Sequence, residues 1–171
     1  GSRWEQFIRN PAAKRFHHAY IGGLLEHSVD VAEMALAVAA TAPGVDRDMV
    51  IAGALLHDIG KTEEISADIG FSYTEAGHLV GHITAGALII DAAALQVQFL
   101  SEAERKSLLH IVLSHHGSRD KGSPIGCATR EAVIVHYADE LNAVLQQFVE
   151  TAEKEGAGWN FNKMMGSMIR V

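Results

Sequence analysis

The sequence Ala54-Leu55-Leu56-His57-Asp58-Ile59-Gly60-Lys61 places two side chains that can bind a metal next to each other. An apolar run precedes them, so His57 and Asp58 would enter the interior at the end of a buried helix. A buried imidazole and a buried carboxylate need partners, because buried polar groups without them are costly. A divalent transition metal accepts both kinds of ligand. The pair therefore predicts a metal site.

Further histidines and a carboxylate that could complete this site recur along the chain. They are His27, His82, the pair His115 and His116, and Asp139. Any one of these histidines alone is more often an ordinary core or surface residue. The prediction of a metal site therefore depends on whether the fold brings the ordered set together.

Helical patterns precede residue 61 and would carry the first of these side chains. A short candidate helix lies around Trp4, Phe7 and Ile8. In residues 24–40, Leu24, Val31, Ala35 and Val38 fall on one stripe at helical spacing, and His27 lies within that stripe and should point inward. Asp46 suits the N-cap of a helix over residues 47–57, for which Gly60 is the expected stop.

The remaining ligand candidates lie on later elements. Residues 62–78 show no clear period and are read as a loop with room for a small hairpin, and a helix over residues 79–99 would carry His82 near its start. Ser101 and Glu104 have the spacing of a capping box, which predicts a helix that ends at His115-His116-Gly117. Thr129 can cap a long helix to about residue 154, on which Asp139 lies.

This order of elements predicts an all-α fold, a helical bundle in a single domain. Residues 1–2 resemble a tag-cleavage scar, residues 3–155 would form the domain, and residues 156–171 would pack back on the bundle as a tail. Neither an internal repeat nor a low-complexity tract interrupts the pattern.

Composition and charge narrow the classes of function. The net charge of −7 gives no general attraction to nucleic acid or to an anionic membrane, so a phosphate substrate would have to be attracted locally, by bound cations. The single cysteine, Cys127, cannot form an internal disulfide and excludes a cysteine-based zinc module. No apolar run is long enough to span a bilayer and no signal-peptide pattern is present, so we expect a cytoplasmic protein without membrane contact.

The ordered set resembles the HD-domain metal-dependent phosphohydrolases. Their pattern is a histidine, then a His-Asp doublet followed by Gly-Lys, then a distant aspartate, and here these are His27, His57, Asp58 with Gly60-Lys61, and Asp139. The resemblance implies the HD-domain helical fold, and metal binding by His27, His57, Asp58 and Asp139.

Other motifs resemble the YhaM-type 3′-to-5′ exoribonucleases over nearly the whole chain. These motifs are Pro11-Ala12-Ala13, His17-His18-Ala19-Tyr20, Gly22-Gly23-Leu24-Leu25-Glu26-His27, Gly81-His82-Ile83, and Ser114-His115-His116-Gly117 through Gly122-Ser123-Pro124. Those enzymes carry an N-terminal OB-fold, which nothing in this chain supplies. At Asn142 the sequence departs from the aspartate common in the family, which we interpret as a tolerable change next to the metal ligands.

A second ion is expected by analogy with the dinuclear HD-GYP phosphodiesterases. His82, His115 and His116 would hold it, with Asp58 as the bridge, although histidines that bind phosphate directly would fit the same residues. A glutamate that serves a third ion in some relatives is Gly23 here, which argues against a third ion. Imidazole-rich sites favour Mn, Fe, Co, Ni or Zn over magnesium. His78, His110 and His136 are not expected to be ligands, although His136 could orient one.

The resemblance implies an enzyme in which metal-activated water cleaves a phosphoester bond. Asp58 and Lys61 are the catalytic candidates, with Lys61 stabilising charge on the phosphoryl oxygens. His17, His18, Lys61 and Arg119 are candidates for binding the substrate, although His17, His18 and Arg119 could equally be surface residues. The implied substrate is the 3′ end of single-stranded RNA. The alternatives are a nucleotide monophosphate, a deoxynucleoside triphosphate or a cyclic nucleotide as substrate, or a regulatory domain that binds its ligand without turnover.

Overall fold

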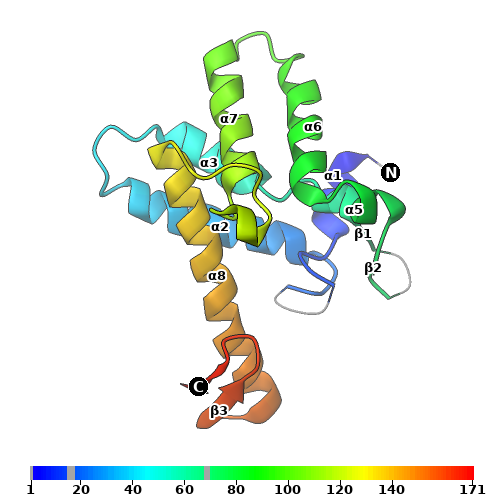
Figure 1. The fold of residues 1–171 in the computed structure, drawn as a ribbon, viewed down its shortest axis with the longest axis vertical. Helices are drawn as coiled ribbons and strands as arrows, with labels where there is room; N and C mark the ends of the chain where they lie inside the picture. Colours follow the sequence, from blue (N-terminus) through cyan, green and yellow to red (C-terminus); the bar gives the residue numbers. More distant parts are fainter. Residues whose placement is uncertain (1, 15–17, 68–69) are drawn as a thin grey trace.

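The computed structural model describes residues 2–14, 18–67 and 70–171, and it shows the predicted helical fold (Figure 1). The helices are α1 (Arg3–Arg9), α2 (Gly23–Ala39), α3 (Arg47–Leu56), α4 (Lys61–Glu64), α5 (Glu75–Leu79), α6 (His82–Ala94), α7 (Glu102–Ser114), the 3₁₀ helix η1 (Arg119–Lys121) and α8 (Arg130–Glu155). Two antiparallel hairpins complete the fold, formed by β1 (Ile65–Ser66) with β2 (Ser72–Tyr73) and by β3 (Trp159–Asn162) with β4 (Ser167–Arg170). Among the described residues, no helix is both long and apolar enough to cross a membrane.

Local capping signals in the sequence set the starts of three helices. The Asp46 side chain accepts a hydrogen bond from the backbone N–H of Met49, and Thr129 caps α8 in the same way. At α7 both halves of the predicted capping box form between Ser101 and Glu104. Such caps are readable from sequence because both partners lie within four residues.

The predicted helix over residues 79–99 is wrong at both ends. Gly81 has a φ of 73°, which separates α5 from α6, so that α6 begins at His82. α6 ends at Ala94, and the chain then turns toward the capped start of α7 at Ser101. Its exposed Phe99 lies in that turn rather than on a helix.

The described parts of the segment 62–78, residues 62–67 and 70–78, are more ordered than a loop. They contain the end of α4, the strands of the small hairpin, and most of α5. Gly60 is also not the stop expected from the sequence: α3 ends at Leu56, and Gly60 is the N-cap of α4 with an ordinary helical φ of −65°. The Thr74 side chain caps α5, a signal that could have revealed this helix.

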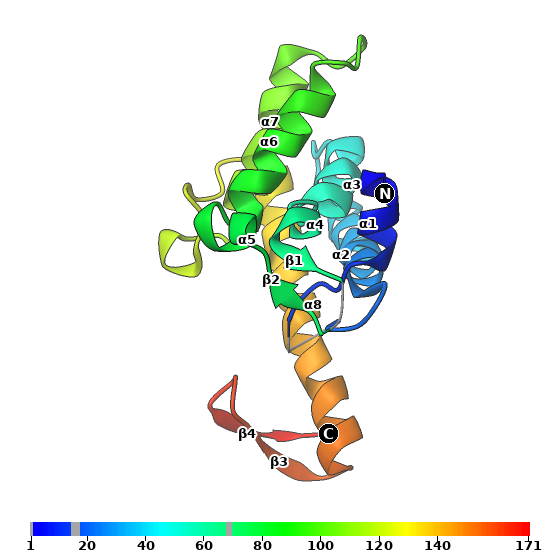
Figure 2. The ribbon, with the colours of Figure 1, turned by 90° about the vertical axis from the view of Figure 1, so that its right-hand side faces the viewer.

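The core lies where α2, α3 and α8 pack together, and the antiparallel pair of α6 and α7 packs beside them (Figures 1 and 2). Leu24, Val31 and Ala35 are buried as the helical stripe predicted, and His27 is buried with them. Val38 is an exception, because half of its side chain is exposed. The stripe therefore directs His27 into the interior, close to α8 and to the C-terminal ends of α3 and α7.

Close packing of α4 on α6 depends on Gly60. A Cβ atom at this position would meet the backbone oxygen of His82 at 2.0 Å and the backbone nitrogen of Gly86 at 2.5 Å. We expect Gly60→Ala to lower the free energy of unfolding by about 3 kcal/mol, because backbone atoms cannot move aside as a side chain can. Urea unfolding measures this change. Gly126→Ala is the control, since its Cβ would find only an ordinary contact at 3.5 Å; an equal loss in both variants would contradict the prediction.

The C-terminal tail packs on the last turns of α8. Its hairpin buries Ile169, and the Asn162 side-chain N–H donates to Thr151 Oγ1 at 3.1 Å. In Figure 2 this hairpin and the end of α8 project away from the other helices. The tail thus lies on a different part of the molecule from the His57–Asp58 pair, and the domain boundaries we expect stay a prediction.

Candidate metal centre

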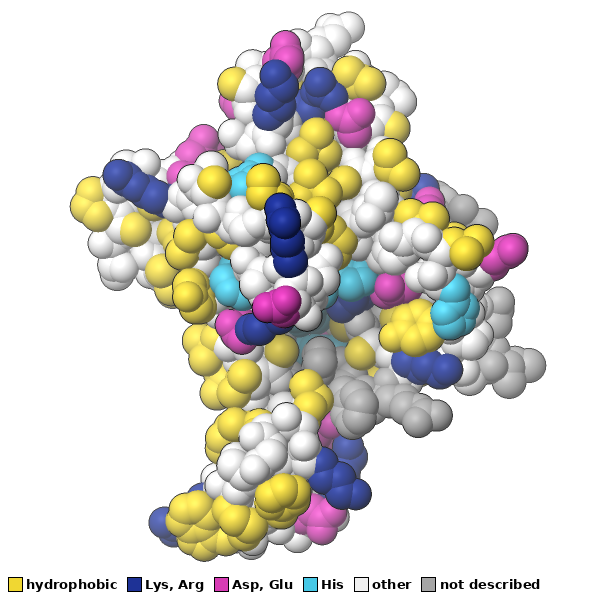
Figure 3. Space-filling model, in the orientation of Figure 1, with side chains coloured by type: hydrophobic (Ala, Val, Ile, Leu, Met, Phe, Trp, Pro, Cys, Tyr) yellow, Lys and Arg dark blue, Asp and Glu magenta, His cyan; other side chains and the backbone are white. Residues whose placement is uncertain are grey.

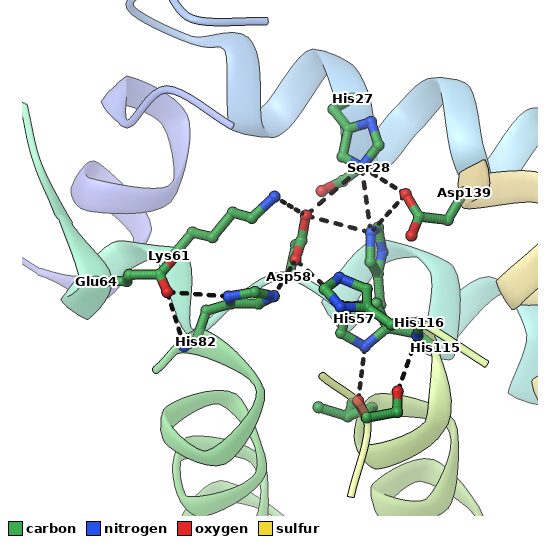
Figure 4. A network of polar contacts seen from close by, with 12 residues as sticks. His27, Ser28, His57, Asp58, Lys61, Glu64, His82, His115, His116 and Asp139 are labelled. Atoms are coloured by element: carbon green, nitrogen blue, oxygen red, sulfur yellow. Dashed lines mark hydrogen bonds and ion pairs between the residues drawn. The ribbon is translucent and has the colours of Figure 1, made fainter. Parts of the chain in front are cut away.

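The His57–Asp58 pair lies in the turn between α3 and α4, where it is surrounded by polar side chains from several helices (Figure 4). Val50 and Ala54 of α3 are fully buried, and this apolar helix carries the next turn into the interior. His57 is 0% exposed and Asp58 is 2% exposed. The apolar run before this pair therefore places both side chains in the interior, as expected.

Two groups of three ligand candidates meet beside this pair. His27, His57 and Asp139 come from α2, the end of α3 and α8, whereas His82, His115 and His116 come from the start of α6 and the end of α7. Within each group the possible ligand atoms lie within 4.8 Å of one another. The fold thus brings together all the residues that the sequence pattern singled out as metal ligands.

Asp58 lies between the two groups, with one carboxylate oxygen directed at each. Its Oδ2 is 3.5 Å from His27 Nε2 and 3.4 Å from His57 Nε2. Its Oδ1 is 3.6 Å from the Nε2 atoms of both His82 and His115. This is the arrangement that a bridging carboxylate requires.

Three of these atoms are buried and lack a hydrogen-bond partner among the described residues. They are Asp58 Oδ1, His82 Nε2 and His115 Nε2. Buried polar atoms are almost always paired, because an unpaired one forfeits its hydration without compensation. Three such atoms that converge at 3.6 Å are too far apart for hydrogen bonds but well placed around a shared cation. The donor set therefore fits a divalent metal.

A hydrogen bond to an oxygen atom orients the imidazole ring of each of the five candidate histidine ligands. In each of the five, Nδ1 hydrogen-bonds to an oxygen and leaves Nε2 facing the centre. The acceptors are Asn142 Oδ1 for His27, the Ala54 carbonyl for His57, Glu64 Oε1 for His82, the Val112 carbonyl for His115 and the Lys121 carbonyl for His116, at 2.6 to 3.1 Å. Metal-binding histidines in proteins are held in this way, and in a neutral ring held so the Nε2 lone pair faces the centre.

Two of these acceptors bear on the sequence interpretation. Asn142, the departure from the family pattern, keeps an oxygen on His27 Nδ1 at 2.9 Å, which is why an amide serves in place of a carboxylate. Glu64 was not recognised from the sequence. It accepts hydrogen bonds from both the ring and the backbone N–H of His82, and only its position one helical turn after Lys61 could have indicated this role.

The charges around Asp58 keep it ionised. Burial would raise the pKa of Asp58, but the charge of Lys61, at 2.6 Å from Oδ2, and that of His57 outweigh burial and hold the pKa well below its usual range. Burial and the nearby charge of His57 lower the pKa of His115 well below its usual range. An ionised carboxylate and a neutral imidazole are the forms that bind metals. His57 differs from His115, because the charge of Asp58 outweighs burial and raises the pKa of His57, so a metal ion bound there would displace its proton.

The candidates for substrate binding are placed differently from one another. Lys61 lines the central cavity, whereas Arg119 is exposed on η1 and His17 lies outside the described residues. His18 is only 2% exposed, so the surface alternative is wrong for it. Its Nδ1 contacts the Tyr20 hydroxyl and its Nε2 contacts Gln146 Nε2, which leaves neither ring nitrogen free for a substrate in this conformation.

The three remaining histidines do not belong to either group of ligands. His78 is exposed beside Tyr73, and His110 Nε2 accepts a hydrogen bond from the backbone N–H of Ala128. His136 Nδ1 donates to the carbonyl oxygen of His115 at 2.7 Å. It therefore contacts the backbone of one ligand candidate, His115, and a role of His136 in orienting a ligand stays a prediction.

A cavity of about 250 Å³ opens onto the candidate metal centre. Histidine side chains reach the surface near the middle of the molecule, with basic and acidic side chains beside them (Figure 3). Lys121 and Glu140 also line the cavity, and sequence reasoning missed both. Neither carries a motif, and only the path of the loop after α7 brings Lys121 to this opening.

Comparison with known proteins gives consistent matches. A family model described as HD domain matches residues 24–144. The 3′-5′ exoribonuclease YhaM of Bacillus subtilis (strain 168) is 39% identical over 153 residues, which are 90% of this chain and 48% of that protein. The protein of the same name from Bacillus licheniformis is 40% identical over 90% of this chain and 49% of its own length. The chain thus spans about half the length of the curated relatives it matches. No solved structure matches it significantly.

Proposed function

From the premise that this chain belongs to the HD domain family, we propose that it is a metal-dependent phosphodiesterase that shortens single-stranded RNA from its 3′ end. The observation that carries the metal-dependent part is the convergence of Asp58 Oδ1, His82 Nε2 and His115 Nε2 as buried atoms without partners. The choice of RNA and of direction is supported by the similarity to relatives that are named 3′-5′ exoribonucleases.

The proposed ligand sets follow the two groups around Asp58. His27, His57 and Asp139 would hold one ion, and His82, His115 and His116 a second, with Asp58 shared between them. Imidazole-rich donors favour Mn, Fe, Co, Ni or Zn. When bound, such ions supply Lewis-acid chemistry and lower the pKa of coordinated water. The chain's own part is to hold the ligands rigidly, through the hydrogen bonds to each Nδ1.

Lys61 is the proposed catalytic cation. Its ammonium group lies at 2.6 Å from Asp58 Oδ2, and its side chain is 13% exposed at the base of the cavity. A phosphate held near Asp58 would come within reach of this group, which could stabilise the charge that grows on the phosphoryl oxygens. Hydrolysis would add water to phosphorus and break the bond to the 3′ oxygen of the preceding ribose. The products would be a nucleoside monophosphate and a shortened strand with a 3′ hydroxyl.

Substrate profiling tests this proposal. The protein is incubated with Mn²⁺ and an oligoribonucleotide labelled at its 5′ end, and in parallel with a cyclic dinucleotide and with bis-p-nitrophenyl phosphate. We expect a ladder of progressively shorter labelled strands, because removal from the 3′ end leaves the label on the long product. Early release of the label as a mononucleotide would contradict the direction. Hydrolysis of small nucleotides alone would favour the small-nucleotide alternative, and inactivity on all three with metal bound would favour the regulatory one.

A further inference from the structure

Lys121 and Glu140 face each other at the opening of the cavity. The Lys121 ammonium forms an ion pair with Glu140 Oε1 and thereby connects η1 to α8. Their side chains are 55% and 42% exposed, and both residues line the cavity together with His116 and Asp139. An ion pair as exposed as this contributes little to stability, so an anion in the opening can replace Glu140 as the partner of Lys121.

The main chain of Lys121 is fixed even though its side chain is exposed. Its carbonyl oxygen accepts a hydrogen bond from His116 Nδ1 at 2.9 Å, and its N–H donates to the Ser118 carbonyl. The backbone N–H of His116 in turn donates to Ser123 Oγ at 3.1 Å. The backbone of Lys121 therefore holds a set position relative to the proposed metal ligands, while its flexible side chain can move within the opening.

The cavity thus has two lysines at different depths. Lys61 is 13% exposed and contacts Asp58 at the base, whereas Lys121 lies at the opening. A cavity of about 250 Å³ lies just below the range of about 300 to 1,000 Å³ that is usual for ligand pockets, so it has room for no more than one nucleotide. If the terminal nucleotide of a strand fills the cavity, the next phosphate must lie at the opening, beside Lys121.

We propose that Lys121 binds the phosphate next to the one at the metal centre. To do so, its ammonium group would leave Glu140 and pair with this second phosphate of the strand. This inference rests on the proposed function and deepens it. Lys121 would give the site a preference for substrates with at least two phosphates, because a substrate with one phosphodiester offers it nothing to bind. Glu140 would hold the lysine while the site is empty.

The test compares the diribonucleotide ApA, which has one phosphate, with the triribonucleotide ApApA, which has two, in the presence of Mn²⁺. The readout is the ratio of kcat/KM for ApApA to kcat/KM for ApA. We expect Lys121→Ala to lower this ratio about 10-fold, the value of one charge-assisted hydrogen bond. Lys121→Arg should retain most of the preference, because it keeps the positive charge.

Lys106→Ala is the matched control, since Lys106 is an exposed lysine on α7 that also pairs with a glutamate, Glu102. Its ratio should stay at the wild-type value. A second readout is the salt dependence of kcat/KM for ApApA. Loss of one phosphate contact should make the slope of its logarithm against log salt shallower by about 0.7 in Lys121→Ala.

The outcomes separate the two proposals. If the wild-type protein cleaves both substrates and Lys121→Ala changes neither the ratio nor the salt slope, the role of Lys121 is refuted while the proposed function stands. A loss in Lys121→Ala that is equal for both substrates refutes it as well, because it would show an effect at the metal centre. If the wild-type protein with bound metal cleaves neither substrate, the proposed function fails, and this inference fails with it.

Discussion

Asp58→Asn should lose both metal ions and reduce turnover by about 10³-fold or more. The reason is its position, because Oδ2 faces His27 and His57 while Oδ1 faces His82 and His115. An amide of the same size offers one weaker acceptor oxygen and no negative charge. Metal content per chain after gel filtration and the rate of oligoribonucleotide cleavage measure the two effects.

The control for Asp58→Asn separates loss of metal from loss of fold. Circular dichroism and urea unfolding show whether the variant folds, and wild-type protein treated with a chelator serves as a second way to empty the centre. We expect the two samples to be equally inactive, with activity returning only to the wild-type protein when Mn²⁺ is added. Full activity of Asp58→Asn in the presence of Mn²⁺ would refute the mechanism.

Lys61→Met should reduce kcat by about 10²- to 10³-fold, the usual loss when one group that stabilises transition-state charge is removed. Methionine keeps much of the side chain's apolar length but not its charge. Metal content should not fall, because in this structure the ammonium group lies at 2.6 Å from Asp58 Oδ2, where it competes with a cation. The expected result is therefore an inactive protein that still holds its metal.

Steady-state kinetics and metal analysis on the same preparation of Lys61→Met test this separation. A kcat close to that of the wild-type protein would show that Lys61 does not reach the reacting phosphate. The role of Lys61 would then be limited to lowering the pKa of Asp58, together with His57. Loss of metal together with activity would mean that Lys61 is needed to assemble the centre.

The sequence predicted those parts of the fold and the candidate site that depend on local patterns. The caps at Asp46, Ser101 and Thr129 involve neighbouring residues, and the apolar stripe around His27 fixes the side of the helix that is buried. The set of candidate ligands could be assembled because a family pattern names them in order. These residues converge around Asp58 once the helices that carry them pack together.

Features that depend on the path of the chain between helices could not be predicted. The start of α6 is set by the positive φ of Gly81, and no periodicity in residues 79–99 shows this break. Glu64, Lys121 and Glu140 acquire their roles from turns that bring distant segments together. The carbonyl oxygens that orient His57 and His115 carry no sequence signal at all, because every residue has one.

The central claim is that Asp58 joins two half-sites, and the number of ions per chain tests it most directly. Protein purified without chelator and dialysed against Mn²⁺ should contain about two ions per chain. His115→Gln, which removes a ligand candidate from one group only, should contain about one. A wild-type protein that binds no ion, even with Mn²⁺ added, would contradict the account, and a wild-type count of one would remove the second half-site.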